Sequence, residues 1–447
     1  MKFNKDFWKR KVLFRLDELV ALVLILGLCL ISLILAVVLW PWRWSRNTPP
    51  PRVLLFSFEG VKVAPARVRC YHFAEVLQKH GVDASVFAYW DEYSRLAHFP
   101  FPFRRIWETE KVLLDAVTLF RLLPRGPMTI MEQRPNYDFL VPLLLRFING
   151  SRVVMDIDDW ILSYKVFHPI EVRHMLSFFS WYSPTCIVSS HRLRTRLSRH
   201  FPHLPLLPTY VDHHRFTPGP HKDADDSPVV FSWVGTIFQD FTYDNVMFMI
   251  ESFALACDTM GQRDAARLEI VGGGDFYNRV KEQIGQRFAD YPVALQPWMA
   301  PDDMPAYLQG IDVGLYCLVE PSLFHESKSP TKIFEYYACA KPVVSTRFGE
   351  ASHFVEHGKT GFLADDREGY AQGIITMIRD RDRRESMGRE ARARVDSGWN
   401  MIDACLTLKG ILLSPAVSET ADTRGMTCPA AVAAASSETF NTVKRRS

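Results

Sequence analysis

Two sets of short, unbroken apolar runs, each alternating with helical patterns, constrain the fold of this chain more than any other feature. The first set is Val53–Phe56, Ala84–Ala88, Met128–Met131 and Arg152–Met155. The second set is Val229–Val234, Leu268–Val271, Val293–Leu295, Val313–Tyr316 and Val343–Ser345. Strands that read as continuous apolar runs are buried on both faces, which is typical of parallel sheets covered by helices. The sequence therefore predicts an α/β protein with two doubly wound, Rossmann-like domains.

Changes in composition indicate where these units begin and end. The expected units are a basic arm and anchor helix (1–48), a first Rossmann-like domain (51–207), a second (208–395), a helix packing back on the first domain (396–414) and a disordered tail (415–447). The Pro-rich stretch 205–212 and the polar stretch 218–228 are predicted to form the hinge and linker between the two domains. The tail is small and polar, with too few apolar residues to build a core.

An apolar stretch near the amino terminus predicts a membrane anchor. Leu19–Trp40 contains 22 residues without a charge. As a helix, such a stretch is about 33 Å long, which matches the hydrocarbon core of a bilayer. A cleaved signal peptide is the alternative, but the stretch exceeds the usual signal core, and the Trp-rich residues 40–44 resemble an interfacial belt. We therefore expect a single helix at the cell membrane.

The charge distribution favours a membrane partner over nucleic acid. The formal net charge of +3 arises within the first eighteen residues, so the rest of the chain is neutral overall. A neutral body lacks the basic surface that binds nucleic acid, whereas a basic arm beside an apolar helix suits an anionic membrane. The eight cysteines are scattered without a CxxC pair, which favours reduced thiols over a disulfide or zinc framework.

The segment SPTKIFEYYACAKPVVS (329–345) combines an apolar helix with polar residues one turn apart. Ser329 and Pro330 predict an N-cap and a proline at the first helical position, so we expect the helix to begin at Pro330. Lys332 and Glu335 share one face. A helix N-terminus attracts phosphate, and a carboxylate one turn further along suits ribose hydroxyls. The alternative is a surface helix with an ordinary Lys332–Glu335 ion pair.

The other motifs of the second half follow in a fixed order. They are PTYVD (208–212), WVGT (233–236), LEIVGGG (268–274), Trp298, IDVGL (311–315) and HGKTGFL (357–363). Together with the helix, they resemble the nucleotide-sugar-binding half of family 4 retaining glycosyltransferases, which have the GT-B fold. The resemblance covers about residues 205–400 and implies two domains that face each other across a cleft. The first half resembles the family more weakly, through GVD (81–83) and DIDDW (156–160).

The resemblance and the helix together indicate a donor site for a nucleotide sugar and no cofactor. The donor-binding set is Gly235, Thr236, Ser329, Thr331, Lys332, Glu335 and Arg67. Arg67 joins this set, with Arg69 as a further candidate, because guanidinium groups suit phosphate and sugar oxygens. Arginines that are simply solvated at a helix start are the alternative for both.

The chain departs from the family at two places. The family has two glutamates separated by seven residues; Glu335 fills the second position, but Ser327 occupies the first. Glu326 is one residue away and could replace the missing glutamate, although other branches of the family carry an SPxK-type segment without it. The family's basic residues after the first strand of this half are absent from Gly235–Val246. We therefore expect Lys332 to take over their role.

The motif DIDD (156–159) has two interpretations. It resembles the DxD metal site of the other large glycosyltransferase fold, where carboxylates hold a divalent cation on the diphosphate. In a GT-B enzyme, however, a helix N-terminus and cations stabilise the leaving group, so no metal is expected. Asp156 would then face the sugar or the acceptor. Our expected catalytic residues are Lys332, Asp156 and Glu326.

The sequence therefore predicts a membrane-anchored hexosyltransferase that moves a sugar from a nucleotide diphosphate to a lipid-linked or polysaccharide acceptor with retention. The alternative is a catalytically inactive binding or scaffold protein with the GT-B fold; an epimerase or hydrolase is a third hypothesis. By the positive-inside rule, the amino-terminal charges favour a cytoplasmic amino terminus, which would place the body on the outer side of the membrane. Because nucleotide sugars are cytosolic, we nevertheless expect a cytoplasmic body, which a re-entrant or monotopic helix would reconcile with the charge bias.

Overall fold

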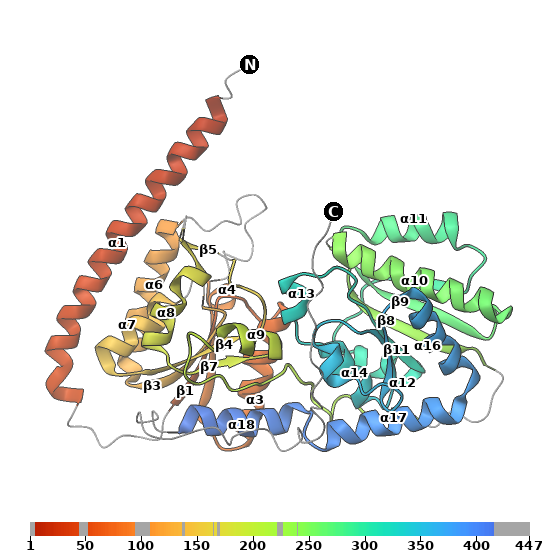
Figure 1. Ribbon diagram of the computed structural model, residues 1–447. Coiled ribbons are helices and arrows are strands. Elements are labelled where there is room, and N and C mark those ends of the chain that lie inside the picture. The colour runs from red at the N-terminus through yellow and green to blue at the C-terminus, as the bar shows by residue number, and fades with distance from the viewer. Residues whose placement is uncertain are drawn as a thin grey trace, which may run out of the picture.

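The chain folds into two α/β domains side by side, with a long helix, α1 (Lys5–Arg43), along the outer side of the first (Figure 1). The computed structural model describes residues 5–43, 52–93, 108–135, 139–163, 165–167, 170–220, 227–238 and 240–414. The predicted tail 415–447, the Pro-rich stretch after α1 and Trp44 of the predicted belt lie outside these residues.

The first domain contains a five-stranded parallel sheet in the order β2-β1-β3-β4-β7. Its strands are β1 (Arg52–Ser57), β2 (Ala84–Ala88), β3 (Met128–Gln133), β4 (Arg152–Ile157) and β7 (Cys186–Val188). All four predicted strands are confirmed. The sequence did not predict β7, which is only three residues long, or the small antiparallel pair β5 (Lys165–Phe167) and β6 (Ile170–Glu171).

The second domain contains a six-stranded parallel sheet in the order β10-β9-β8-β11-β12-β13. Its strands are β8 (Val229–Thr236), β9 (Ala266–Gly273), β10 (Val293–Gln296), β11 (Val313–Tyr316), β12 (Val343–Thr346) and β13 (Gly361–Ala364). The five predicted strands are confirmed. This order is that of a doubly wound nucleotide-binding sheet, in which the direction of winding reverses between the first and fourth strands, here β8 and β11.

Helices cover both sheets, as buried parallel strands require. Those of the first domain are α2 (Ala64–Ala66), a π-helical turn η1 (Arg67–His72), α3 (Phe73–Lys79), α4 (Tyr89–Glu92), α6 (Glu108–Leu122), the short η2 (Leu123–Arg125), α7 (Leu140–Asn149), α8 (Val172–Tyr182) and α9 (His191–Leu197). Those of the second are α10 (Asp240–Met260), α11 (Tyr277–Arg287), α12 (Met304–Gly310), α13 (Leu323–Ser327), α14 (Thr331–Ala338), α15 (Ala351–Phe354), α16 (Arg367–Arg379) and α17 (Arg381–Asp396).

The last helix, α18 (Met401–Leu413), returns from the second domain to the first, along the lower edge of Figure 1. Asn400 caps it by accepting a hydrogen bond from the backbone N–H of Asp403. The helix packs against α3, and Lys409 Nζ donates to the carbonyl of His80 at 2.8 Å. Arg152 at the start of β4 donates to the carbonyl of Ile411 at 2.9 Å. These contacts connect the two domains at a second place besides the hinge.

Helix α1 packs against α6 and α7. Leu28 is buried in the apolar cluster beneath these helices, and Thr109 Oγ1 donates to the carbonyl of Asp17 at 3.2 Å. Within the described residues, α1 is the one helix long and apolar enough to cross a membrane, judged by length and composition alone. Most of its apolar side chains remain exposed, including Leu22, Leu26 and Leu33.

Candidate functional site

Ligands of doubly wound sheets bind at the carboxyl ends of the strands, where the strand order reverses. In the second domain this point lies between β8 and β11, and in the first domain between β1 and β3. Residues that follow these four strands are therefore the candidates for substrate contacts. The segment that follows β11 leads through α13 into α14, which carries Lys332 and Glu335.

Helix α14 is fixed against the sheet by its apolar side. Tyr336 and Tyr337 are completely buried, and the Tyr336 ring lies over Gly314 of β11. A Cβ atom at position 314 would lie 2.3 Å from that ring, so glycine is needed for the helix to pack this closely. Lys332 and Glu335 lie half-buried on the other side of the helix. The predicted polar face is thus present.

The predicted start of this helix is wrong. It begins at Thr331, and Ser329 makes no capping hydrogen bond to it. Pro330 adopts φ −85° and ψ 61°, which is not helical, so the first turn forms one residue later. Ser329 Oγ instead accepts a hydrogen bond from the backbone N–H of Thr209 at 3.0 Å, and the N–H of Thr331 donates to the Ser329 carbonyl. Ser329 therefore holds the hinge segment next to the helix.

Gly235 near the end of β8 leaves room for the Lys332 side chain. A Cβ atom at position 235 would lie 3.2 Å from Lys332 Cε and 2.6 Å from the ring of Trp233. Lys332 Nζ lies 5.5 Å from the centre of the same ring, within range of a cation–π interaction. Thr236, the last residue of β8, is exposed. The structure thus brings Gly235 and Lys332 together where the order of the strands reverses.

The site carries more positive than negative charge. Burial and the neighbouring Lys328 lower the pKa of Lys332 to about 8, although Glu335 opposes the shift. Burial raises the pKa of Glu335 to about 7, against the effect of Lys332 and Arg67. Burial likewise lowers the pKa of Lys328. Two cations, Lys332 and Arg67, act on the Glu335 carboxylate, and Lys328 acts on Lys332. These cations would attract an anionic ligand such as a diphosphate.

Arg67 reaches this group from the first domain. It lies half-buried in η1, and Glu335 acts to raise its pKa although burial and Arg215 lower it. Its Nη1 donates a long hydrogen bond of 3.5 Å to the carbonyl of Lys62. Arg67 thus acts on Glu335 from the other domain.

Asp156, which was expected to face the sugar or the acceptor, forms a buried ion pair. It is completely buried at the end of β4, and both its carboxylate oxygens accept hydrogen bonds from Arg69, one of them from Nε at 2.6 Å. Arg69 also donates to the carbonyl of Leu207 at 3.0 Å and to Thr209 Oγ1 at 3.3 Å. Both side chains are completely closed off from solvent. Their ion pair instead supports the hinge.

The other two aspartates of the DIDD motif contact an arginine that the sequence analysis missed. Arg134 Nε donates to Asp158 at 2.6 Å, and its Nη2 lies 3.6 Å from a carboxylate oxygen of Asp159. Its Nη1 lies 3.4 Å from Glu59, which follows β1. Arg134 directly follows β3 and has a positive φ of 55°. A search for charged residues just after strand ends would have found both Arg134 and Glu59.

Glu326 lies on α13 and contacts the first domain. Its carboxylate forms an ion pair with Arg192 Nη2 on α9 at 2.5 Å. Ser327, where the family has its first glutamate, is completely buried. Lys328 follows α13. Burial lowers its pKa, and the charge of Asp159 in the first domain acts to raise it. The sequence did not predict a role for Arg192 or Lys328, because both depend on how the two domains meet.

Known proteins resemble this chain most in the domain that carries Lys332 and Glu335. Residues 228–380 match the family Glycosyl transferases group 1. This match agrees with the resemblance predicted from the motifs of the second half. It covers the six-stranded sheet from β8 to β13, together with α14.

Two curated relatives align with a similar length of the chain. A D-inositol 3-phosphate glycosyltransferase from Pseudarthrobacter chlorophenolicus is 34% identical over 149 residues, which are 32% of this chain and 34% of the relative. A GDP-mannose-dependent alpha-(1-6)-phosphatidylinositol monomannoside mannosyltransferase from Mycobacterium tuberculosis is 28% identical over 139 residues, 30% of this chain and 36% of the relative. The chain thus spans about a third of the length of these relatives.

Similarity to a solved structure extends over both domains. The Anabaena protein HepE in complex with UDP-glucose superimposes with a TM-score of 0.58, at 17% sequence identity, over 80% of this chain and 99% of that protein. At this identity the likeness concerns the fold. It confirms that the two parallel-sheet domains are arranged as in GT-B glycosyltransferases.

Proposed function

We propose that the chain is a retaining glycosyltransferase that transfers a hexose from a nucleotide diphosphate to an acceptor. The observation that carries this proposal is the pair of cations that act on Glu335, Lys332 and Arg67, at the reversal point of a group 1 glycosyl transferase domain. Such cations attract an anion, and strongly shifted pKa values like those of Lys332 and Glu335 are a feature of functional sites. A nucleotide diphosphate supplies that anion, and its ribose hydroxyls can donate hydrogen bonds to the Glu335 carboxylate.

In this proposal the residues act mainly by electrostatics. During transfer, the bond between the anomeric carbon and the diphosphate oxygen breaks, and its electron pair leaves with the diphosphate. Lys332 would stabilise this growing negative charge, because a cation held in place by Gly235 and Trp233 needs no reorganisation. Glu335 would orient the donor through its ribose. The acceptor hydroxyl oxygen then forms the new bond to the anomeric carbon on the same face, and its proton passes to the departing diphosphate.

We propose a lipid-linked or polysaccharide acceptor that approaches from the first domain. The Mycobacterium tuberculosis relative acts, by its name, on a phosphatidylinositol monomannoside, which is a lipid carrying a sugar. Arg67 of the first domain acts on Glu335, and Asp159 and Arg134 of the same domain act on Lys328. Glu326 remains our candidate for a role near the sugar, although its ion pair with Arg192 would have to open.

We further propose that α1 attaches the chain to the cell membrane, with the body on the cytoplasmic side. The exposed apolar side chains of α1 continue onto its neighbour α6, whose exposed residues include Leu113, Val117 and Phe120. These three residues lie at spacings of four and three and therefore form one face of α6. An apolar surface shared by two adjacent helices fits contact with lipid. Protease accessibility of the body in sealed vesicles tests the orientation.

A screen of nucleotide sugars with the purified full-length chain tests the enzymatic proposal. Binding of one donor, followed by sugar transfer or slow release of the nucleoside diphosphate, is the expected result. The alternative is a binding or scaffold protein with the same fold. It predicts a thermal shift with the nucleotide but no turnover with any donor or acceptor extract. In that case Lys332→Met would change the affinity for the nucleotide, and there would be no rate of sugar transfer for it to lower.

A further inference from the structure

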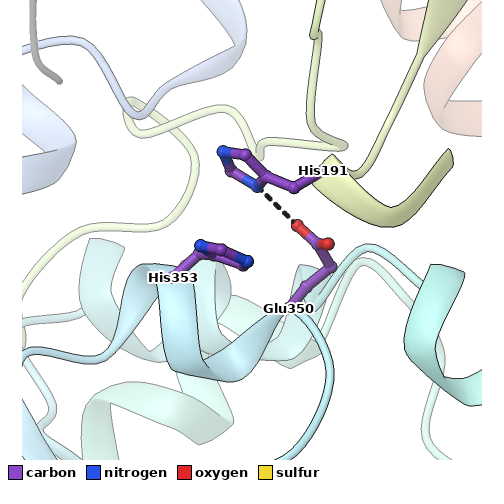
Figure 2. A group of neighbouring side chains, drawn as sticks. All are labelled: His191, Glu350 and His353. Atoms are coloured by element: carbon purple, nitrogen blue, oxygen red, sulfur yellow. Dashed lines mark hydrogen bonds and ion pairs between the residues drawn. The ribbon is translucent and has the colours of Figure 1, made fainter. Parts of the chain in front are cut away.

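Outside the proposed donor site, three side chains with metal-binding atoms meet between the two domains (Figure 2). His191 is the first residue of α9 in the first domain. Glu350 and His353 belong to the segment that forms α15 in the second domain. One candidate ligand atom from each residue lies within 4.8 Å of those from the other two. The group therefore connects two domains that the chain otherwise joins through the hinge and α18.

The candidate ligand atoms of the group lie close to one another. Nδ1 of His191 lies 2.9 Å from a carboxylate oxygen of Glu350, and the His191 and His353 rings stack with centres 4.1 Å apart. Figure 2 shows the two rings one above the other, with the Glu350 carboxylate beside them. Neighbouring ligand atoms on a tetrahedral zinc ion with bonds near 2.0–2.1 Å are roughly 3.3 Å apart. The planes of the stacked rings differ by 23°, so the imidazoles must turn before their nitrogens and the carboxylate converge on one ion.

The burial of the Glu350 carboxylate also favours a cation beside it. The side chain is only 2% exposed. Its two carboxylate oxygens accept hydrogen bonds from His191 Nδ1 and from the backbone N–H of Arg192 at 3.2 Å. Among the described residues, no lysine or arginine side chain forms an ion pair with it. A buried carboxylate is normally paired with a cation or coordinates a metal.

We propose that His191, Glu350 and His353 form a Zn²⁺ site that bridges the two domains. Two imidazoles and one carboxylate are a donor set that zinc accepts, with water in the fourth position. The ion would replace the proton of the hydrogen bond between His191 Nδ1 and the Glu350 carboxylate. None of its three residues belongs to the donor-binding set, so the expectation that no metal acts on the diphosphate is a separate matter.

The neighbouring contacts indicate what such an ion would do. Arg192, next to His191, forms the ion pair with Glu326 of α13. A Cβ atom at Gly349, next to Glu350, would lie 3.5 Å from Glu326 Cα, so the two loops touch. The zinc site and the Arg192–Glu326 pair would thus fasten the same edge of the interdomain contact. Zinc would hold the two domains in the arrangement of Figure 1.

Zinc titration of the full-length chain in detergent, first treated with a chelator and competed against a chromogenic zinc dye, tests the proposal. The wild type should bind one equivalent of Zn²⁺, and added Zn²⁺ should raise its midpoint of thermal unfolding. His353→Gln should weaken binding by at least about tenfold and abolish the thermal shift, since it removes one of three ligands. His353 is exposed, so this variant should fold.

Two further variants make the result specific. Glu350→Gln should lose the site in the same way while keeping the shape of the side chain. His200→Gln removes an exposed histidine shortly after α9 and should bind Zn²⁺ like the wild type. Equal zinc affinity in the wild type and His353→Gln would overturn the proposal and leave a proton-sharing His191–Glu350 pair. Weaker binding in His200→Gln would indicate adventitious surface binding and overturn it equally.

Discussion

Arg69 holds Asp156 through two parallel hydrogen bonds, and both side chains are completely buried where the first domain meets the hinge. The same guanidinium binds the carbonyl of Leu207 and the hydroxyl of Thr209. Thr209 in turn donates its backbone N–H to Ser329, just before the helix with Lys332. A continuous set of hydrogen bonds therefore runs from the end of β4 to the candidate donor site.

Asp156→Asn is expected to lower the free energy of unfolding by about 3–5 kcal/mol, because it leaves the Arg69 charge buried without a partner. Chemical denaturation followed by circular dichroism measures this loss. Asp365→Asn is a matched control, since it removes the same type of charge from an exposed pair with Arg347. That change should cost less than about 1 kcal/mol. Equal stability of the two variants would show that the Asp156–Arg69 pair does not stabilise the fold, and Asp156 would again be a candidate for contact with the substrate.

Lys332→Met is expected to lower the rate of transfer more than the affinity for the donor. The diphosphate gains charge as the glycosidic bond breaks, so a held cation acts mainly in the transition state. We expect a loss of tenfold or more in kcat, roughly 1.4 kcal/mol. Steady-state kinetics measures it, with Lys359→Met as the control, because Lys359 is half exposed in a loop after α15. Full turnover in Lys332→Met would leave Lys332 with only a structural role.

Glu335→Ala is expected to weaken binding of the nucleotide sugar, because the ribose hydroxyls lose a charge-assisted acceptor. Such a contact contributes about 1.5–3 kcal/mol. Calorimetry with the donor found by the nucleotide-sugar screen measures the change. The same titration with a nucleoside diphosphate whose ribose lacks its hydroxyls should show no difference between the variant and the wild type. Unchanged affinity for the intact donor would contradict the ribose assignment.

The strands could be predicted from the sequence because each is buried on both faces, so its residues must be apolar whatever the neighbouring strands are. Gly235, Lys332 and Glu335 could be placed together because the order of a doubly wound sheet fixes where its ligands bind. The partners of Asp156 could not be predicted. Asp156 and Asp158 are two residues apart and both are buried in ion pairs, but Arg69 and Arg134 lie 87 and 24 residues away from them, so no local pattern shows which aspartate pairs with which arginine.

Contacts between the domains were also beyond prediction. Nothing in the local sequence of Glu326 indicates that Arg192 will be its partner, because the two belong to different folded units. The same holds for His191, Glu350 and His353. Glu350 and His353 have the Glu-x-x-His spacing of some metal sites on helices, but His191 is 159 residues from Glu350, and its proximity to them follows only from the way in which α9 meets α15.

The binding of a nucleoside diphosphate is expected to pass through a maximum between about pH 7 and pH 8. Lys332, with its pKa near 8, is protonated below that pH and loses its charge as the pH rises through it, so the affinity should fall on the alkaline side. Bound diphosphate favours the charged lysine and raises its pKa, so binding above pH 8 should take up a proton. Glu335, with its pKa near 7, becomes ionised above that pH and then accepts ribose hydrogen bonds more strongly, so the affinity should fall on the acidic side as well. Calorimetry over the range from pH 6 to 9, in buffers of different ionisation enthalpy, measures both the affinity and the proton uptake. Lys332→Met should remove the alkaline decline and Glu335→Gln the acidic one, while Lys359→Met should keep both. An alkaline decline that persists in Lys332→Met would assign it to another group and refute the role of Lys332 as the principal phosphate cation.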